Sequence, residues 1–76
     1  MRYYIIRMRD DALIGCRVGC QESRTLESYA TREEAYKALE GYRNHTMRNV
    51  YFKVQAAESP PPDWSKKYEF RDFDIF

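Results

Sequence analysis

A segment near the middle of the chain carries the three signals that together indicate a helix: a start, a periodic apolar face and an end. Thr31 is followed three residues later by Glu34, the pattern of a capping box. In that motif the threonine hydroxyl accepts from the Glu34 backbone N–H, and the Glu34 carboxylate reaches back to the N–H of Thr31. Apolar residues then recur at helical spacing: Ala35, Ala38, Leu39 and Tyr42. Residues 28–44 therefore predict one short helix with a narrow apolar face, which has to lie on a flat partner.

The remaining apolar runs alternate with a period of two residues, which is typical of half-buried strands. Residues 3–9 form the first such run. Its softer, helix-facing side is predicted at the even positions Tyr4, Ile6 and Met8. Residues 10–11 then predict a turn, and residues 12–20 predict the second strand of a β-hairpin. Gly15 and Gly19 are poor strand formers and indicate a bulge or a close backbone approach.

The rest of the predicted sheet lies on both sides of the helix in the sequence. A polar turn is expected at 21–24, followed by a short third strand at 25–29. After the helix, residues 50–56 alternate between apolar and polar side chains more clearly than any other run. The order of these elements predicts an α+β fold: a small two-layer sandwich, ββ(β)αβ, in which one helix covers an antiparallel-rich sheet.

Residues 1–57 are expected to form this single domain. The chain has 76 residues, and a domain of that size buries only about 60% of the surface that its unfolded chain exposes. A content of 43% hydrophobic and 16% aromatic residues is too apolar for a disordered chain. The domain should therefore fold alone, as a monomer, or as a homodimer.

Residues 58–76 differ in composition from the domain. Three consecutive prolines at 60–62 lack a backbone N–H and favour polyproline II, so they predict a stiff spacer. Beyond them an aromatic or isoleucine side chain follows at nearly every second position. Because one helix offers too little apolar surface to cover the sheet, residues 63–73 are expected to pack against the domain, with residues 74–76 frayed. The alternative is that this tail is a recognition peptide for a partner.

The net charge of +1 provides neither the strong basic field of a duplex nucleic-acid binder nor the acidic field of a DNA mimic. Residues 1–57 hold ten Lys and Arg against seven Asp and Glu, whereas residues 58–76 hold three against five, so the tail is mildly acidic. Neither a signal-peptide pattern nor a membrane-spanning run is expected. The two cysteines are expected to be free thiols in a reducing compartment, which predicts a cytoplasmic protein.

No motif in the chain dictates a reaction. Cys16 and Cys20 have a C-x-x-x-C spacing, but zinc needs about four ligands, and the only histidine, His45, lies beyond the predicted helix. A lone histidine also lacks the partner group that a general base needs. No Gly-rich phosphate loop and no hydrolase or metalloprotease motif is present. The chain is therefore expected to be non-enzymatic and to bind no metal and no cofactor.

A partner-binding surface is predicted on the face of the sheet opposite the helix. If the even positions of the first strand face the helix, rings and cations gather on the open side: Tyr3, Ile5, Arg7, Arg9, Arg17, Tyr51 and Lys53. Such a face fits a protein-binding hot spot, a platform on which single-stranded nucleic acid stacks its bases, or an ordinary solvated sheet. The tail offers further anchors for a protein partner: Phe70, Asp72, Phe73 and Asp74.

As a whole, the chain resembles small proteins of bacteriophages and mobile elements, most of all the anti-CRISPR type: one small domain with seven Tyr, with Arg as its commoner cation, and without a catalytic motif. The resemblance covers residues 1–57 and assigns no residue a role. It implies a non-enzymatic inhibitor that blocks a host defence nuclease complex of the CRISPR type by steric occlusion. Many such inhibitors are acidic mimics of nucleic acid, and this chain departs from them with its net charge of +1. The alternative function is a small single-stranded nucleic-acid-binding module that uses the aromatic and basic sheet face.

Overall fold

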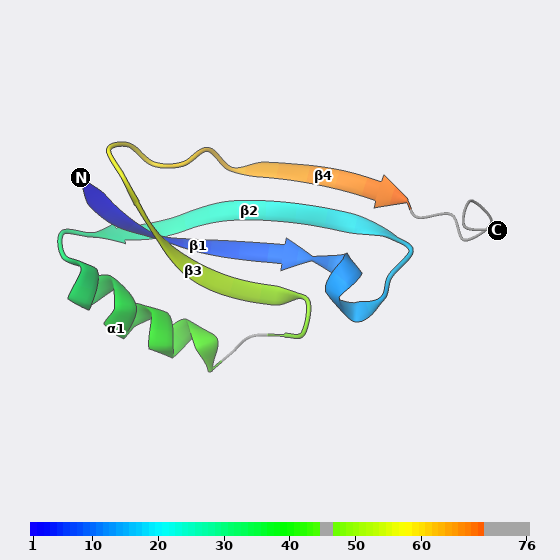
Figure 1. Ribbon diagram of the computed structural model, residues 1–76, viewed down its shortest axis with the longest axis horizontal. Coiled ribbons are helices and arrows are strands. Elements are labelled where there is room, and N and C mark those ends of the chain that lie inside the picture. Colours follow the sequence, from blue (N-terminus) through cyan, green and yellow to red (C-terminus); the bar gives the residue numbers. More distant parts are fainter. Residues whose placement is uncertain (45–46, 70–76) are drawn as a thin grey trace.

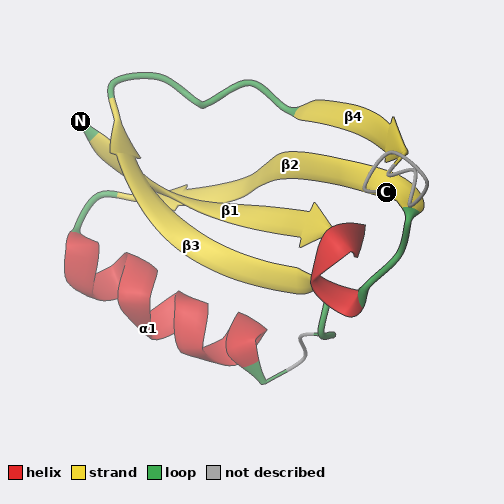
Figure 2. Ribbon diagram, turned by 45° about the vertical axis from the view of Figure 1, so that its right-hand side comes forward, coloured by secondary structure: helices red, strands yellow, loops and turns green. Residues whose placement is uncertain are grey.

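The computed structural model describes residues 1–44 and 47–69, and it has the predicted α+β fold. In this part of the chain, four strands form one antiparallel sheet in the order β3-β1-β2-β4, and helix α1 packs on one face of the sheet (Figures 1 and 2). A short 3₁₀ helix, η1, follows β1. The elements are β1 Arg2–Asp10, η1 Asp11–Ile14, β2 Val18–Tyr29, α1 Arg32–Arg43, β3 Val50–Ala57 and β4 Trp64–Glu69.

Helix α1 lies where the sequence predicts a helix. Thr31 is its N-cap, and the Thr31 hydroxyl accepts a hydrogen bond of 3.3 Å from the Glu34 backbone N–H. Near the other end of the helix, the Tyr42 ring stacks on the Phe52 ring of β3 with the centroids 5.0 Å apart. Two residues of the predicted apolar face are fully covered by the sheet: Ala35 and Leu39. The predicted N-cap, through the Thr31 hydroxyl, and the predicted apolar face are thereby confirmed.

The predicted orientation of β1 is wrong, because its odd positions face the helix. The Arg32 guanidinium of α1 lies over the Tyr3 ring, 5.7 Å from its centroid. Further along, Arg7 pairs with Phe52, the residue whose ring contacts α1. Directly paired residues of antiparallel strands lie on the same face of a sheet. The odd positions of β1 therefore point toward α1, and the even positions point away from it.

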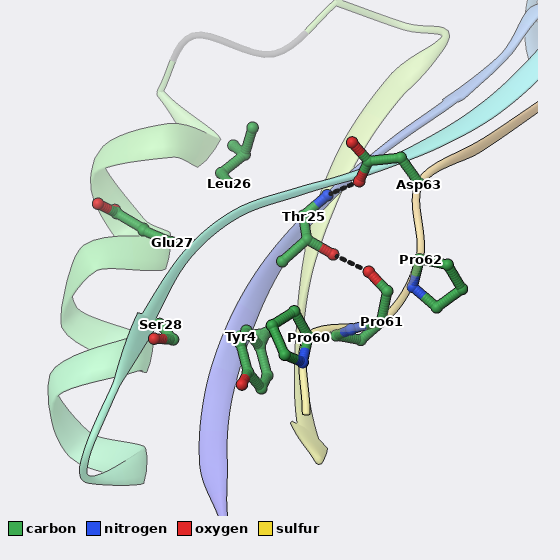
Figure 3. Close-up of a pocket in the computed structure, with 9 residues that line it drawn as sticks. All are labelled: Tyr4, Thr25, Leu26, Glu27, Ser28, Pro60, Pro61, Pro62 and Asp63. Atoms are coloured by element: carbon green, nitrogen blue, oxygen red, sulfur yellow. Dashed lines mark hydrogen bonds between the residues drawn. The ribbon is translucent and has the colours of Figure 1, made fainter. Parts of the chain in front are cut away.

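Two even positions of β1, Tyr4 and Ile6, lie on the face that is crossed by a different segment, the linker between β3 and β4. Tyr4 and Ile6 are only 5% and 1% exposed. Thr25, the β2 residue that pairs with Ile6, makes two hydrogen bonds to the linker. Its hydroxyl donates to the Pro61 carbonyl at 2.9 Å, and its backbone N–H donates to the Asp63 carboxylate at 2.8 Å (Figure 3). Strand β1 is therefore the buried centre of the sheet, with apolar side chains on both faces.

The hairpin formed by β1 and β2 is longer than the sequence predicts. Residues 11–14 form η1 instead of the start of a strand. One strand of 12 residues, β2, then replaces the predicted polar turn at 21–24 and the predicted short strand at 25–29. The polar residues stay in the strand because they have partners: the Glu22 carboxylate accepts a hydrogen bond of 2.8 Å from Arg7 on β1.

The β-bulge of this hairpin lies at Leu26 and not at a glycine. Ile5 pairs with Glu27 whereas Ile6 pairs with Thr25, so Leu26 is the extra residue of β2. Gly15 instead closes η1 with a φ of 77°, in the left-handed region that glycine adopts without strain.

Buried polar contacts hold the far end of the hairpin. The Asp11 carboxylate accepts hydrogen bonds from the Cys20 backbone N–H at 2.9 Å, from the Asn49 side chain at 3.0 Å and from the Arg9 guanidinium at 3.0 Å. The bond from Cys20 and then that from Asn49 lower the pKa of Asp11 to about 2. Gly19 shows the predicted close approach, because a Cβ there would lie 2.5 Å from the Asp11 Cβ. These five residues are named the tip cluster.

Beyond the prolines, the chain adds a fourth strand to the sheet. Residues 64–69 form β4, which pairs antiparallel with residues 18–23 of β2. Five of the six residues of β4 are exposed, and the Trp64 side chain is 46% exposed. The strand is therefore held by its backbone ladder more than by the burial of rings. Residues 70–76, which include part of the predicted packing segment, lie outside the described residues.

Candidate binding surface

Side chains from all four strands meet on the face of the sheet that points away from α1. The register aligns four residues in one row across the sheet: Tyr51, Met8, Ser23 and Trp64. Neighbouring strands lie about 4.8 Å apart, so the row is about 14 Å long. Lys53 and Lys66 are exposed on the same face beside the row. The open surface is defined as Met8, Tyr51, Lys53, Trp64 and Lys66.

The proline linker covers only part of this face. It shields Tyr4 and Ile6 and ends at Asp63, one residue before Trp64. Within residues 1–44 and 47–69, no helix or strand lies over the open surface, and the Tyr51 and Trp64 side chains stay 45% and 46% exposed. The open surface therefore combines two accessible rings and a methionine with two cations on a hydrogen-bonded sheet.

A hollow of about 540 Å³ lies between the proline linker and β2 (Figure 3). It is lined by Tyr4, Thr25, Leu26, Glu27, Ser28, Pro60, Pro61, Pro62 and Asp63. The Tyr4 ring lies next to Pro60, whereas the Glu27 side chain points toward α1, where it accepts a hydrogen bond of 2.8 Å from the Tyr42 hydroxyl. Since Thr25 and Asp63 also bond to each other, most polar side chains of this hollow already have partners. The hollow is therefore a seam that seats the linker on the sheet.

A second, smaller hollow joins this seam to the open surface. Its volume is about 240 Å³, and it is lined by Ser23, Arg24, Asp63, Trp64 and Ser65. Asp63 borders both hollows, and Trp64 belongs to the open surface. The indole ring thus stands beside a polar depression that a partner side chain could enter.

Three of the predicted partner-binding residues do not lie on the open surface. Tyr3, Arg7 and Arg9 face the side of α1, because β1 has the opposite orientation to the predicted one. The Arg7 guanidinium is bonded to Glu22 at 2.8 Å, and the Arg9 guanidinium to Asp11 at 3.0 Å. These side chains stabilise the sheet, so their predicted position on the open face is wrong, whereas their role in partner binding stays a prediction.

The remaining predicted residues fall into three groups. Tyr51 and Lys53 lie on the open surface, as the alternation of β3 predicts. Arg17 is exposed in the turn between η1 and β2. The tail residues Phe70, Asp72, Phe73 and Asp74 lie outside the described residues, so their role stays a prediction.

The sequence patterns missed three members of the open surface. Met8 was predicted to face the helix, and it lies on the other face because the whole of β1 is turned over. Trp64 and Lys66 belong to β4, and no local pattern specifies that this strand pairs with β2. The one signal in the sequence is that Trp64, Lys66 and Tyr68 alternate, which places them on one face once a strand forms.

Cys16 and Cys20 both carry free thiols. Among residues 1–44 and 47–69, no group of three or more His, Cys, Asp or Glu side chains is arranged to hold a metal ion. In the described part of the chain, no helix is long and apolar enough to cross a membrane. The chain matches no protein-family model, no curated protein and no solved structure. A functional proposal therefore has to rest on the residues of the open surface.

Proposed function

We propose that this protein is a non-enzymatic binding module that recognises another protein through the open surface. The observation that carries the proposal is the row of Tyr51, Met8 and Trp64, which puts two half-exposed rings and a thioether on one sheet face. Tyr, Trp and Met are enriched at the centres of protein interfaces, and a few such side chains supply most of the binding energy. Lys53 and Lys66 stand where a polar rim is expected.

The sheet lowers the cost of binding at this surface. The three apolar side chains extend from paired strands, and the rings of Tyr51 and Trp64 each have only two rotatable χ angles. Less conformational entropy is therefore lost when a partner covers them than on a loop. Full burial of a large apolar side chain contributes about 1.5–3 kcal/mol. Because both rings are already about half covered, they supply only part of the affinity of a transient complex.

The test compares Trp64→Ala with the matched control Tyr36→Ala. Tyr36 is 50% exposed on α1, which covers the opposite face of the sheet. The wild type and both variants are immobilised, and the proteins captured from an extract of the native host are quantified by mass spectrometry. A genuine partner should be retained by the wild type and by the control, and its affinity should fall about 30-fold with Trp64→Ala, as at a hot spot. Equal retention by both variants would place the binding site elsewhere.

One observation favours a second candidate function, the binding of single-stranded nucleic acid. The open surface sets Tyr51 and Trp64 beside Lys53 and Lys66, and bases stack on such rings at about 1–3 kcal/mol each while cations contact phosphate. Trp64 is the only tryptophan of the chain, so its fluorescence reports stacking directly. Quenching by a single-stranded oligonucleotide that disappears as salt is raised would support this candidate. Unchanged fluorescence at low salt would leave the protein partner as the proposal.

The partner that we propose is a host defence nuclease complex of the CRISPR type, which the module blocks by steric occlusion. Support for this narrower step comes from the resemblance of the chain, in size and in its Tyr and Arg content, to inhibitors from phages and mobile elements. Occlusion predicts that the purified protein slows target cleavage by such a complex and that Trp64→Ala abolishes the inhibition. Unchanged cleavage in the presence of excess protein would refute the inhibitor role and leave the binding module in place.

A further inference from the structure

The sheet ends in two edge strands, β3 and β4, and they differ in what a second strand would meet there. An edge strand presents unpaired backbone N–H and C=O groups, which form a template for another chain. The centre of β4 carries Lys66 and Lys67. Any antiparallel pairing of two β4 strands that is centred on these residues sets lysine against lysine, which is unfavourable. These two lysines therefore disfavour a second copy at the β4 edge in the registers centred on them.

The β3 edge lacks this protection. Its eight residues include a single charged side chain, Lys53. On the side of α1, Phe52 and Val54 are only half-buried, although they belong to the apolar layer between helix and sheet. No further strand of the described chain lies beyond them. A strand added at this edge would cover more of these two side chains.

The small size of the core gives a reason for a second copy to occupy the edge. The apolar side chains that the described part of the chain buries are Tyr4, Ile5, Ile6, Ala35, Leu39 and Val50. Domains below about 80 residues usually add disulfides, metals or oligomerisation to such a core. Both cysteines of this chain are free thiols, so no disulfide crosslinks it. A second copy would extend the apolar layer at Phe52 and Val54.

We propose that two copies pair antiparallel through β3 with Val54 on the two-fold axis, forming one eight-stranded sheet. In such a dimer, the two residues that pair across the β3–β3 contact have side chains on the same face of the sheet. Side chains alternate along a strand, so the two-fold axis has to lie at one residue position of β3 and not midway between two consecutive residues. An axis at Lys53 would set two lysines against each other. An axis at Val54 sets Lys53 opposite Gln55 and Phe52 opposite Ala56, and it pairs residues 51–57 without a like-charge contact.

This dimer goes beyond the proposed function and can fail separately from it. Both open surfaces lie on the same side of the extended sheet, and Trp64 lies on β4, at the opposite edge from the dimer contact. Trp64→Ala therefore tests the partner and leaves the dimer intact.

Charge substitutions at Gln55 test both the dimer and its register. Gln55 is exposed, so substitutions there leave the monomer fold unaffected. In Gln55→Lys the new lysine faces Lys53 of the other copy twice per dimer, and the dissociation constant measured by analytical ultracentrifugation should rise about 2- to 30-fold. Gln55→Glu should lower it, and the double variant Lys53→Glu/Gln55→Lys should restore dimerisation. A wild type that stays monomeric up to millimolar concentration, or equal constants for the two Gln55 variants, would overturn the proposal.

Cysteine crosslinking tests independently whether the two-fold axis lies at Val54. In a Cys16→Ser/Cys20→Ser background, Val54→Cys brings two thiols together across the axis, where Cα atoms of paired residues are about 4.5–5.5 Å apart and within disulfide range. In the control Tyr51→Cys, the two thiols are about 20 Å apart along the ladder at about 3.3 Å per residue. Oxidation should give a covalent dimer with Val54→Cys and leave the control monomeric on a non-reducing gel. Equal crosslinking of both variants, or of neither, would refute this register.

Discussion

The two ends of the β1–β2 hairpin are held by different forces. At the end covered by α1, apolar side chains fill both faces of β1, and Ile5 and Ile6 are 0% and 1% exposed. At the far end, the buried residue is Asp11, 7% exposed, whose carboxylate accepts hydrogen bonds from Arg9 and Asn49 among other partners. The comparison teaches that this sheet extends past its apolar core because a buried polar group there has all its partners. The stability of the first end should depend on the volume of its buried apolar side chains. The stability of the second should depend on the free space at Gly19 and on the charge of Asp11.

The largest effect is expected at the apolar end. Ile5→Ala removes a fully buried side chain between helix and sheet and should lower the free energy of unfolding by about 2–5 kcal/mol. That is a large share of the stability of a small domain. Urea denaturation followed by circular dichroism measures it, with Leu13→Ala on η1 as a control. Leu13 is 56% exposed, so its loss should change stability by less than about 0.5 kcal/mol. Similar midpoints for both variants would contradict an apolar anchor at Ile5.

A larger side chain at Gly19 should destabilise the polar end of the hairpin. Gly19→Ala places a Cβ 2.5 Å from the Asp11 Cβ and should cost about 1–3 kcal/mol, because the tip cluster has to shift. Gly41→Ala in α1 is the matched control, since its new Cβ meets nothing within 4 Å. There alanine should stabilise the helix by up to about 1 kcal/mol. Thermal melts of the two variants should therefore move in opposite directions, and a shift in the same direction would show that the approach at Gly19 is not tight.

The helix cap tests how strongly the apolar end depends on α1. Thr31→Ala removes the acceptor of the Glu34 N–H and should cost about 1 kcal/mol, which lowers the melting temperature by about 4–8 °C. Thr31→Ser keeps the hydroxyl and should melt close to the wild type. If the alanine variant melts like the wild type, the cap does not limit the stability of this end.

The most local effect is expected from acid, at the polar end. In the folded protein the pKa of Asp11 is about 2, below its ordinary value of 3.8. The ionised carboxylate therefore stabilises the fold fully above about pH 4, and this contribution is lost as the pH falls toward 2. Thermal melts between pH 5 and pH 2 should show a steeper loss for the wild type than for Asp11→Asn. The protection factor of the Cys20 amide, which donates to Asp11, should fall in the same window once the pH dependence of the intrinsic exchange rate is taken into account. Parallel pH profiles of the two proteins would rule out Asp11 as the titrating group.

Features that depend on neighbours in the sequence could be predicted well. Thr31 and Glu34 are three residues apart, so the cap and the start of α1 follow from the chain alone. In β3, apolar side chains alternate with polar ones. This pattern correctly placed Tyr51 and Lys53 together on the face of the sheet that points away from α1. The need for glycine at position 19 was also visible, although its neighbour, the Asp11 side chain, was not.

The tertiary structure decided which face of β1 lies under α1. Both faces of this strand are apolar, as Ile5 and Ile6 show, so a period of two residues defines two faces without saying which one the helix covers. Because of that ambiguity, Tyr3, Arg7 and Arg9 were predicted on the open face, whereas they lie on the side of α1.

The sequence by itself determined the α+β class, the helix with its cap, and strand β3, because these depend on local periodicity and on contacts three or four residues apart. The tertiary structure decided the long β2, the pairing of β4 and the composition of the open surface. Glu22 stays in a strand because Arg7 lies beside it, and Trp64 joins Tyr51 and Met8 because β4 pairs with β2. Such contacts join residues far apart in the chain, so their free energy exists only once the sheet has formed.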